Sequence, residues 1–167
     1  MSKGNVYFFT GLSGAGKTTI GGLFHARIKE KRNDVVVFDG DKTRQSFGKD
    51  IGYSNEERLR GAYRLFSIAK FIAEQGIDVV VCSICMYDEI RDWNRENIEN
   101  YHEIYIKVAK ETLIKRNQKG LYTNGRNVVG VDLPFDEPKH PDLVIENNGD
   151  KTPEEIVIEI EKLLGVN

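Results

Sequence analysis

The sequence predicts an α/β fold in which an about five-stranded parallel sheet lies between two layers of helices. Three observations lead to this prediction. Short apolar runs alternate with segments of helical periodicity, the first run leads directly into a glycine-rich turn, and no linker or repeat divides the 167 residues. Strands that are separated by helices pair in parallel and need helical cover on both faces. We therefore expect residues 1–167 to form a single domain.

Five apolar segments are the expected strands of this sheet. The first of them, NVYFFT, carries Tyr7, Phe8 and Phe9, which are expected in the core. Each segment is short and compact, as buried strands of a parallel sheet are. The segments are residues 5–10, 35–38, 79–82, 103–108 and 143–145, of which the last is the weakest.

Helical spacing and end signals define the helices between these strands. After the glycine-rich turn, apolar residues recur at helical spacing at Ile20, Leu23, Phe24 and Ile28. A long helix is expected to begin at the capping-box pair Ser54 and Glu57 and to end at Gly76. A last helix over residues 156–164 follows a cap, a proline at N1 and a glutamate at N3, which are Thr152, Pro153 and Glu155.

Composition narrows the class of protein and its partners. Hydrophobic residues make up 40% of the chain and charged residues 30%, which is typical of a globular domain. The net charge is −2 and the basic residues are dispersed, so we expect no nucleic-acid partner. The apolar runs are too short to span a bilayer, and the N-terminus does not resemble a signal peptide. We therefore expect no membrane partner and a cytoplasmic location.

The glycine-rich turn indicates nucleotide binding. Residues 11–18 read GLSGAGKT and fit G-x-x-x-x-G-K-[ST] between an expected strand and an expected helix, which is the context of a P-loop. Backbone N–H groups of such a loop surround phosphate oxygens, and the helix N-terminus adds its dipole. Lys17 should reach the β- and γ-phosphates, and Thr18 should bind Mg²⁺. The expected ATP contacts are Gly11, Ser13, Gly14, Ala15, Gly16, Lys17, Thr18 and Thr19, in a P-loop NTPase fold. The alternative is a glycine-rich turn with a chance lysine.

An acidic pair at the end of the second strand favours an enzyme over a switch. No guanine-specific N-K-x-D motif occurs, and residues 79–83 do not form a hydrophobic strand that ends in aspartate. The second strand instead runs into Asp39-Gly40-Asp41, and the carboxyl ends of parallel strands face the ligand crevice. A carboxylate there could orient an acceptor hydroxyl and take its proton. The alternative is a solvated Asp-Gly turn.

Several motifs in order resemble the adenylyl-sulfate kinase family. They are GLSGAGKTT, FDGDKTR, IGYS, KGLY and GVDLPFDEP, and they cover the chain from Gly11 to about Pro138. The resemblance implies transfer of the ATP γ-phosphate to the ribose 3′-hydroxyl of a nucleotide with a small anionic 5′ group, and commonly a homodimer. It implies that Asp41 is the catalytic carboxylate, supported by Asp39 and Lys17, and that Arg116 lies beside the ATP adenine. ATP and Mg²⁺ would be the cofactors.

The resemblance also implies an acceptor site, in which some positions depart from the family. Tyr53 should stack on the acceptor base, whereas Val128 replaces the second stacking aromatic. Gly61 stands for an asparagine, and Cys85 for a serine. The acceptor contacts carried over are Asp41, Arg44, Tyr53, Arg58, Ile84, Cys85, Lys119, Gly120, Leu121 and Val128.

These departures leave the acceptor open. Adenylyl sulfate ranks first, slightly above another nucleotide such as cytidine diphosphoramidate, a substrate of capsule modification whose pyrimidine needs less stacking surface. A kinase of a small metabolite or of a polynucleotide end, and a non-catalytic ATP-binding module, are further alternatives.

The long segment 118–138 is expected to be a lid, because connections of this length are usually lids or binding segments. Its closure would exclude water from the site. Four arginines on expected helices are interpreted as solvated, namely Arg60, Arg64, Arg91 and Arg95. Cys82 and Cys85 form C-x-x-C, which is interpreted as a core cysteine and a pocket cysteine, with redox chemistry or half a zinc site as the alternative.

Overall fold

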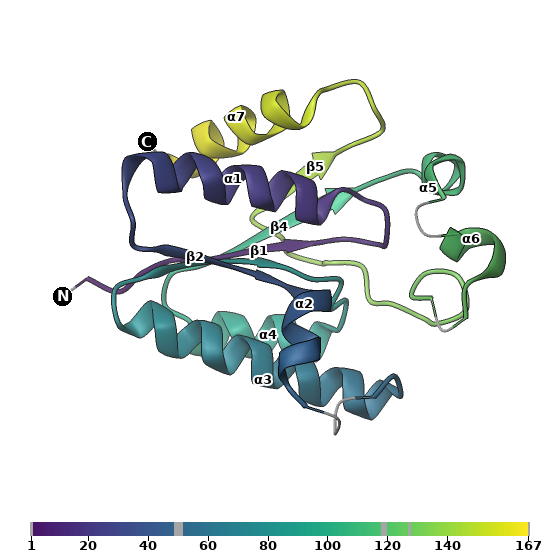
Figure 1. Cartoon of the computed structure of the whole chain (residues 1–167), viewed down its shortest axis with the longest axis horizontal. Coiled ribbons are helices and arrows are strands. Elements are labelled where there is room, and N and C mark those ends of the chain that lie inside the picture. Colours follow the sequence, from purple (N-terminus) through teal and green to yellow (C-terminus); the bar gives the residue numbers. More distant parts are fainter. Residues whose placement is uncertain (1, 49–51, 118–119, 127, 167) are drawn as a thin grey trace.

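Five parallel strands form one sheet in the computed structural model, which describes residues 2–48, 52–117, 120–126 and 128–166 (Figure 1). The strand order is β2-β3-β1-β4-β5. The central strands β1 and β3 are buried along their whole length, because helices cover both faces of the sheet. The five expected strands are confirmed, with ends that differ by one or two residues. The strands are β1 (Val6–Thr10), β2 (Val35–Asp39), β3 (Asp78–Cys82), β4 (Tyr101–Lys107) and β5 (Leu143–Glu146).

Helices lie on both faces of this sheet, as expected for three layers. In Figure 1, α1 (Lys17–Lys31) and α7 (Pro153–Leu164) lie above the sheet, and α3 (Asn55–Glu74) and α4 (Asp88–Asn97) lie below it. Side chains of β1 alternate between the two faces. Phe9 belongs to the hydrophobic cluster shared with α1 and α7, whereas Phe8 belongs to the cluster shared with α3. There the rings of Phe8 and Phe66 meet edge to face with centroids 4.8 Å apart.

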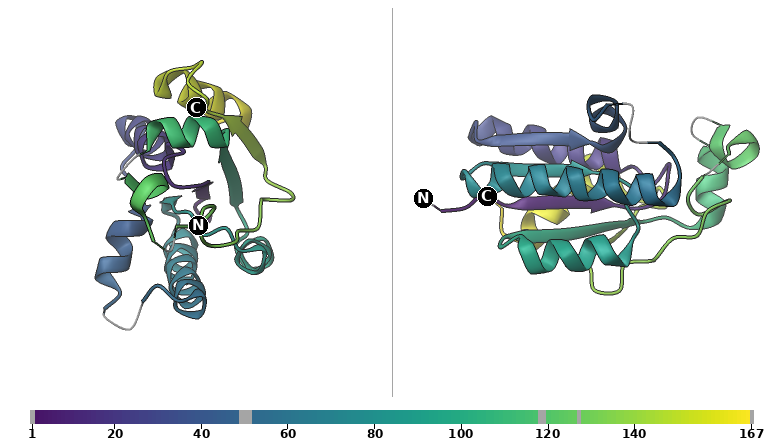
Figure 2. Two further views of the ribbon diagram at one scale, coloured as in Figure 1. Left: turned by 90° about the vertical axis from the view of Figure 1, so that its right-hand side faces the viewer. Right: turned by 90° about the horizontal axis from the view of Figure 1, so that it is seen from below.

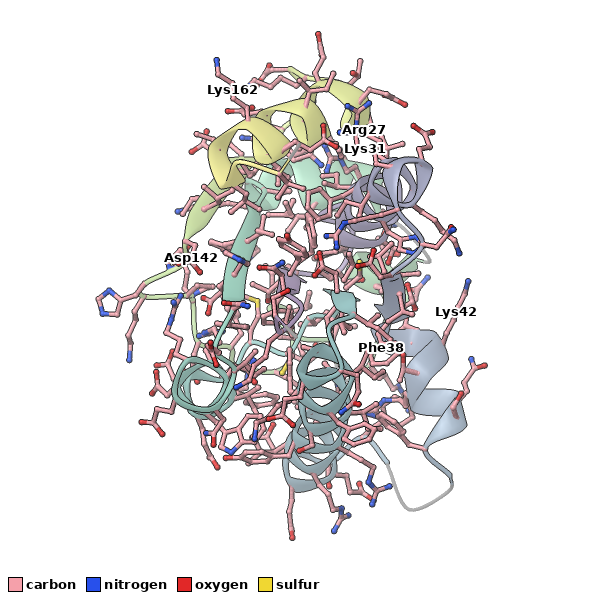
Figure 3. All side chains as sticks on the ribbon, turned by 90° about the vertical axis from the view of Figure 1, so that its left-hand side faces the viewer. Arg27, Lys31, Phe38, Lys42, Asp142 and Lys162 are labelled. Atoms are coloured by element: carbon pink, nitrogen blue, oxygen red, sulfur yellow. The ribbon has the colours of Figure 1, made fainter. Side chains whose placement is uncertain are left out.

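Helix ends follow the sequence signals closely. Both expected capping boxes are present, Ser54 with Glu57 at α3 and Thr152 with Glu155 at α7. A bidentate ion pair joins the two helices of the upper layer, because Arg27 Nη2 lies 2.7 Å from Glu161 Oε2 and its Nε also donates to that carboxylate. Figure 3 shows Arg27 where α1 and α7 meet. No helix in the described part of the chain is long and apolar enough to cross a membrane.

Three short helices gather at the carboxyl ends of the strands. They are α2 (Gly40–Ser46), α5 (Lys110–Arg116) and α6 (Leu121–Asn124). Figure 2, left, looks onto this end of the molecule, and the two termini lie at the opposite end in Figure 1. None of the three was predicted from the sequence. In particular, Asp39-Gly40-Asp41 does not simply end a strand. Asp39 accepts hydrogen bonds from the amides of Asp41 and Lys42, so it caps α2.

The expectation that Arg91 is solvated was wrong. Its side chain is 4% exposed and donates to Asp88 Oδ1 at 2.7 Å and to the carbonyl of Asp136 at 2.6 Å. The carboxylate of Glu103 on β4 lies 3.9 Å away. A buried guanidinium needs such partners, which here come from α4 itself, from β4 and from Asp136 further along the chain. Arg91 therefore anchors the end of the segment 128–138 to α4.

Two adjacent glycines of α1 give a matched test of the packing between α1 and the sheet. A Cβ added at Gly21 would lie 2.3 Å from Cys82 Sγ, whereas a Cβ at Gly22 would meet nothing within 4 Å. Gly21→Ala should therefore lower the free energy of unfolding by about 1–2 kcal/mol through overpacking. Gly22→Ala should raise it by about 0.5–1 kcal/mol, because alanine loses less backbone entropy in a helix. Urea unfolding of both variants measures the difference, and effects of the same sign would contradict the described packing.

Candidate active site

The glycine-rich loop between β1 and α1 has the conformation of an anion-binding turn. Gly14 and Gly16 have φ angles of +81° and +99°, in the left-handed region that favours glycine. Gly16 occupies the N-cap position of α1, and no side chain caps the helix and no acid lies in its first turn. The helix N-terminus therefore keeps N–H groups and a positive dipole for an anion, which fits the phosphates of a nucleotide.

Lys17 and Thr18, the first residues of α1, lie at the centre of the site. The Lys17 side chain is buried, and its ammonium donates to the Leu12 carbonyl at 2.8 Å. The Thr18 hydroxyl donates to Asp39 Oδ2 at 2.9 Å. Because the other oxygen of Asp39 caps α2, this carboxylate ties the P-loop helix to the acidic pair. A hydroxyl and a carboxylate side by side are ligands that suit Mg²⁺, so the residues present fit this ion.

One cavity of about 210 Å³ opens between the P-loop, α2, α3, the end of β3 and the lid segment. Many of the expected site residues meet there, which the sequence could not show by itself. The expected residues that line it are Ser13, Gly14, Gly16, Lys17, Thr18, Thr19, Asp39, Asp41, Arg44, Arg58, Ile84 and Cys85. Other lining residues, which we did not expect, are Phe47, Asn55, Ala62, Leu65, Ser83, Met86, Tyr87, Val129, Leu133 and Pro134. Gly61, noted in the sequence for its departure from the family, lines the cavity too.

The remaining expected residues lie around this cavity or outside the described part. The expected residues that the structure describes but that do not line the cavity are Gly11, Ala15, Tyr53, Arg116, Gly120, Leu121 and Val128. Lys119 lies outside the described residues. The lid turn explains the position of Val128, because its carbonyl accepts from the amides of Val131, Asp132 and Leu133. The neighbouring Val129 lines the cavity in its place.

Two arginines and an aromatic ring form the rim beside α2 and α3. The guanidinium carbons of Arg44 and Arg58 lie 4.8 Å and 5.5 Å from the centroid of the Tyr53 ring. Arg58 Nε donates to the Tyr53 carbonyl at 2.9 Å, and Arg44 donates to the carbonyl of Gly52. The Tyr53 residue is 66% exposed. This arrangement places planar cations where they suit an anionic group of a ligand.

The two cysteines are buried and line the same cavity. Burial raises the pKa of the Cys82 thiol to about 12, and it raises the pKa of the Cys85 thiol to about 12 as well. Among the described residues, no three side chains of His, Cys, Asp or Glu gather to hold a metal ion. The raised pKa values favour the protonated form of both thiols. Cys85 has a φ of +31°, which is a strained conformation for a residue with a side chain.

Both α5 and α6 contact the P-loop. The Tyr122 hydroxyl of α6 donates to the Ser13 carbonyl at 2.6 Å, and Arg116 Nη1 lies 3.4 Å from the Gly14 carbonyl. Arg116 also donates to the carbonyl of Asn147 at 2.7 Å. Tyr122 was not among the expected contacts, because only Lys119, Gly120 and Leu121 of the motif KGLY were carried over from the family.

A helix N-terminus with N–H groups open to an anion, which shares a cavity with the carboxylates that follow β2, is the arrangement of a P-loop kinase. Comparison with known proteins gives the family. The family model described as adenylylsulphate kinase matches residues 3–146. The chain belongs to this family, and it is therefore a phosphotransferase that uses ATP.

Three known proteins illustrate the relationship. The cytidine diphosphoramidate kinase of Campylobacter jejuni is 42% identical over 98% of this chain and 99% of its own length. The adenylyl-sulfate kinase of Bacillus velezensis is 36% identical over 87% of this chain and 77% of its own length. The structure of the APS kinase of Mycobacterium tuberculosis in complex with AMPPNP and APS has a TM-score of 0.89, with 29% identity and 99% of both chains covered.

The buried thiols lead to a test of the cavity. At about pH 8, a thiol with a pKa of about 12 is almost wholly protonated, so the folded protein should react with a thiol reagent roughly 10³-fold more slowly than free cysteine. Titration with Ellman's reagent, with the protein unfolded in guanidinium chloride as the control, measures this. Rapid reaction of either cysteine in the folded protein would show that the cavity holds a reactive thiolate.

Proposed function

We propose that this protein transfers the γ-phosphate of ATP to the ribose 3′-hydroxyl of a nucleotide with a small anionic 5′ group, and that its acceptor is cytidine diphosphoramidate. One observation carries the choice of acceptor. The similarity to the cytidine diphosphoramidate kinase extends over 98% of this chain and 99% of that relative at 42% identity. This similarity ranks cytidine diphosphoramidate above adenylyl sulfate, whereas the sequence motifs alone rank adenylyl sulfate first.

The chemistry of phosphate transfer follows from the residues that line the cavity. The P-loop amides and the α1 N-terminus would bind the ATP phosphates, and Lys17 would exchange its bond to the Leu12 carbonyl for one to the β- and γ-phosphates. Thr18 and Asp39 would hold Mg²⁺, which neutralises phosphate charge when it is bound. Arg116, at the base of the lid, would lie beside the adenine.

Asp41 is the proposed general base. It lies in the first turn of α2 and lines the cavity together with Lys17 and Thr18. A carboxylate in this position could accept the proton of the acceptor hydroxyl as the hydroxyl oxygen attacks the γ-phosphorus. The cap that Asp39 makes on α2 fixes the backbone of Asp41, because the Asp41 amide is one of its two donors.

The acceptor would occupy the part of the cavity between α3, the end of β3 and the lid. Arg44 and Arg58 would bind its anionic 5′ group through charge-assisted hydrogen bonds, with Tyr53 beside them at the rim. Gly61 and Cys85, at which the chain departs from the family motifs, both line the cavity. Changed side chains at these two positions support a changed acceptor on an unchanged phosphate-transfer site.

Adenylyl sulfate is the second candidate acceptor. It is favoured by the likeness of the fold to the APS kinase whose structure contains APS. The lid over residues 118–138, the single domain over residues 1–167, the homodimer and the cytoplasmic location remain predictions.

The role of Asp41 can be tested by replacing one of its carboxylate oxygens with an amide nitrogen. Asp41→Asn should lower kcat by roughly 10²–10⁴-fold, because the amide cannot accept the proton, while the affinity for ATP stays nearly unchanged. The measurement is ADP release at saturating ATP and acceptor, with ATP binding followed separately by calorimetry. Asp150→Asn is the matched control, because Asp150 is exposed and outside the cavity. Undiminished turnover of Asp41→Asn would refute the assignment of the base.

The acceptor can be tested by comparing the two candidates directly. With cytidine diphosphoramidate and adenylyl sulfate present in separate reactions, we expect the kcat/KM for the cytidine compound to be at least about tenfold higher, which corresponds to about 1.4 kcal/mol of selective transition-state binding. Coupled measurement of ADP release gives both values. A preference for adenylyl sulfate would assign the protein to sulfate activation instead.

A further inference from the structure

The backbone carbonyls of residues 12–15, in the P-loop, each accept a hydrogen bond from a side chain. Their donors, in order, are Lys17, Tyr122, Arg116 and Asn147, at 2.8, 2.6, 3.4 and 2.9 Å. Only the first donor belongs to α1. The other three come from α6, α5 and the residue after β5, which are more than a hundred residues later than the loop in the sequence.

The hydrogen bonds to these carbonyls fix the direction in which the amides of the loop point. In a planar trans peptide, the carbonyl of one residue and the N–H of the next point in opposite directions. The bond from Tyr122 to the Ser13 carbonyl therefore turns the N–H of Gly14 to the other side, and the bond from Asn147 to the Ala15 carbonyl does the same for Gly16. Glycines with positive φ would otherwise leave these peptides free to rotate.

Tyr122 is itself firmly placed. Its amide donates to Asn117 Oδ1 at 3.1 Å, which fixes α6 to the C-terminal end of α5. Burial raises the pKa of its phenol, so the group remains a hydrogen-bond donor. A Cβ added at Gly14 would lie 4.0 Å from Tyr122 Cε2, so the ring reaches the glycine that the hydroxyl positions.

The other arm of the lid contacts the same loop. A Cβ added at Gly130 would lie 2.8 Å from Leu12 Cδ2, so the backbone at Gly130 packs closely against the Leu12 side chain. Gly130 also has a φ of +86°, in the left-handed region. The P-loop is thus in contact with α6 and with the turn at residues 128–133.

We propose that Tyr122 and Asn147 are positioning residues of the P-loop, and that the Tyr122–Ser13 hydrogen bond couples the position of the lid to the affinity for ATP. The proposal rests on the proposed phosphate transfer, but it concerns ATP alone and requires no particular acceptor. Loss of the phenol hydroxyl frees the peptide between Ser13 and Gly14, so the loop must be ordered again whenever ATP binds. The cost appears in ATP binding and much less in the chemical step.

The test uses Tyr122→Phe, which removes one hydroxyl, and Asn147→Leu, which removes an amide at nearly constant shape. The matched control is Tyr63→Phe, because the Tyr63 hydroxyl also makes a 2.6 Å hydrogen bond, to Glu89, away from the cavity. Calorimetry with a non-hydrolysable ATP analogue and Mg²⁺ gives the Kd. Hydrogen exchange of the free protein reports on the peptides that cover residues 11–18 and 120–126.

Both site variants should raise the Kd for the analogue roughly two- to tenfold, the effect of one lost hydrogen bond. Exchange over residues 11–18 should become faster in both, whereas Tyr63→Phe should change neither. In steady-state kinetics, the KM for ATP should rise while kcat changes by less than about twofold.

An unchanged Kd in Tyr122→Phe would overturn the proposal. So would faster exchange over residues 120–126 with none over residues 11–18, because Tyr122 would then stabilise only the lid. An equal effect of Tyr63→Phe would also overturn it. These readouts need no acceptor, so they remain decisive even when neither candidate acceptor is phosphorylated.

Discussion

The site depends on the parallel register of three adjacent strands. Cys82 at the end of β3 pairs with Phe9 of β1 on one side and with Asp39 of β2 on the other. The three strands therefore end at the same level, and the loop after β1 and the acidic pair after β2 open toward the same cavity. Neighbouring strands are about 4.8 Å apart, so β2 lies roughly 10 Å from β1. The hydrogen bond from Thr18 to Asp39 closes this gap and joins the proposed phosphate site to the proposed site of proton transfer.

The surroundings of this bond explain how one small cavity could serve both substrates. The end of β3, between the two functional strands, contributes neutral thiols and not a charged group to the cavity. The cations of Arg44 and Arg58 lie on the side of α2 and α3, whereas Lys17 lies in the P-loop. Positive groups thus lie at two sides of the cavity. The carboxylates of Asp39 and Asp41, which also line it, come between Lys17 and the two arginines in the sequence. Such a distribution suits an anionic donor and an anionic acceptor that must approach each other.

The sequence predicted those parts that local patterns define. The five strands, the P-loop and both capping boxes have signals within a few residues, and all are present. The helix α2 was missed because its start depends on the Asp39 side chain, whose capping bonds cannot be distinguished from a turn in D-G-D. Arg91 was misjudged because two of its partners, Glu103 on β4 and Asp136 in the segment 118–138, lie far from it in the sequence. Two further features could not be predicted, namely that Val129 lines the cavity and that Tyr122 contacts the P-loop. Both depend on how the segment 118–138 packs against the rest of the fold, and neither periodicity nor motif spacing gives evidence of that packing.

The central claim is that ATP and a nucleotide acceptor meet in this cavity with the ribose 3′-hydroxyl between Asp41 and the γ-phosphate. The most direct measurement is a crystal structure of the complex with a non-hydrolysable ATP analogue, Mg²⁺ and cytidine diphosphoramidate. We expect the 3′-oxygen within hydrogen-bonding distance of an Asp41 carboxylate oxygen and in line with the γ-phosphorus, with the 5′ group on Arg44 and Arg58. A nucleotide bound with another group facing Asp41, or bound outside the cavity, would contradict the account.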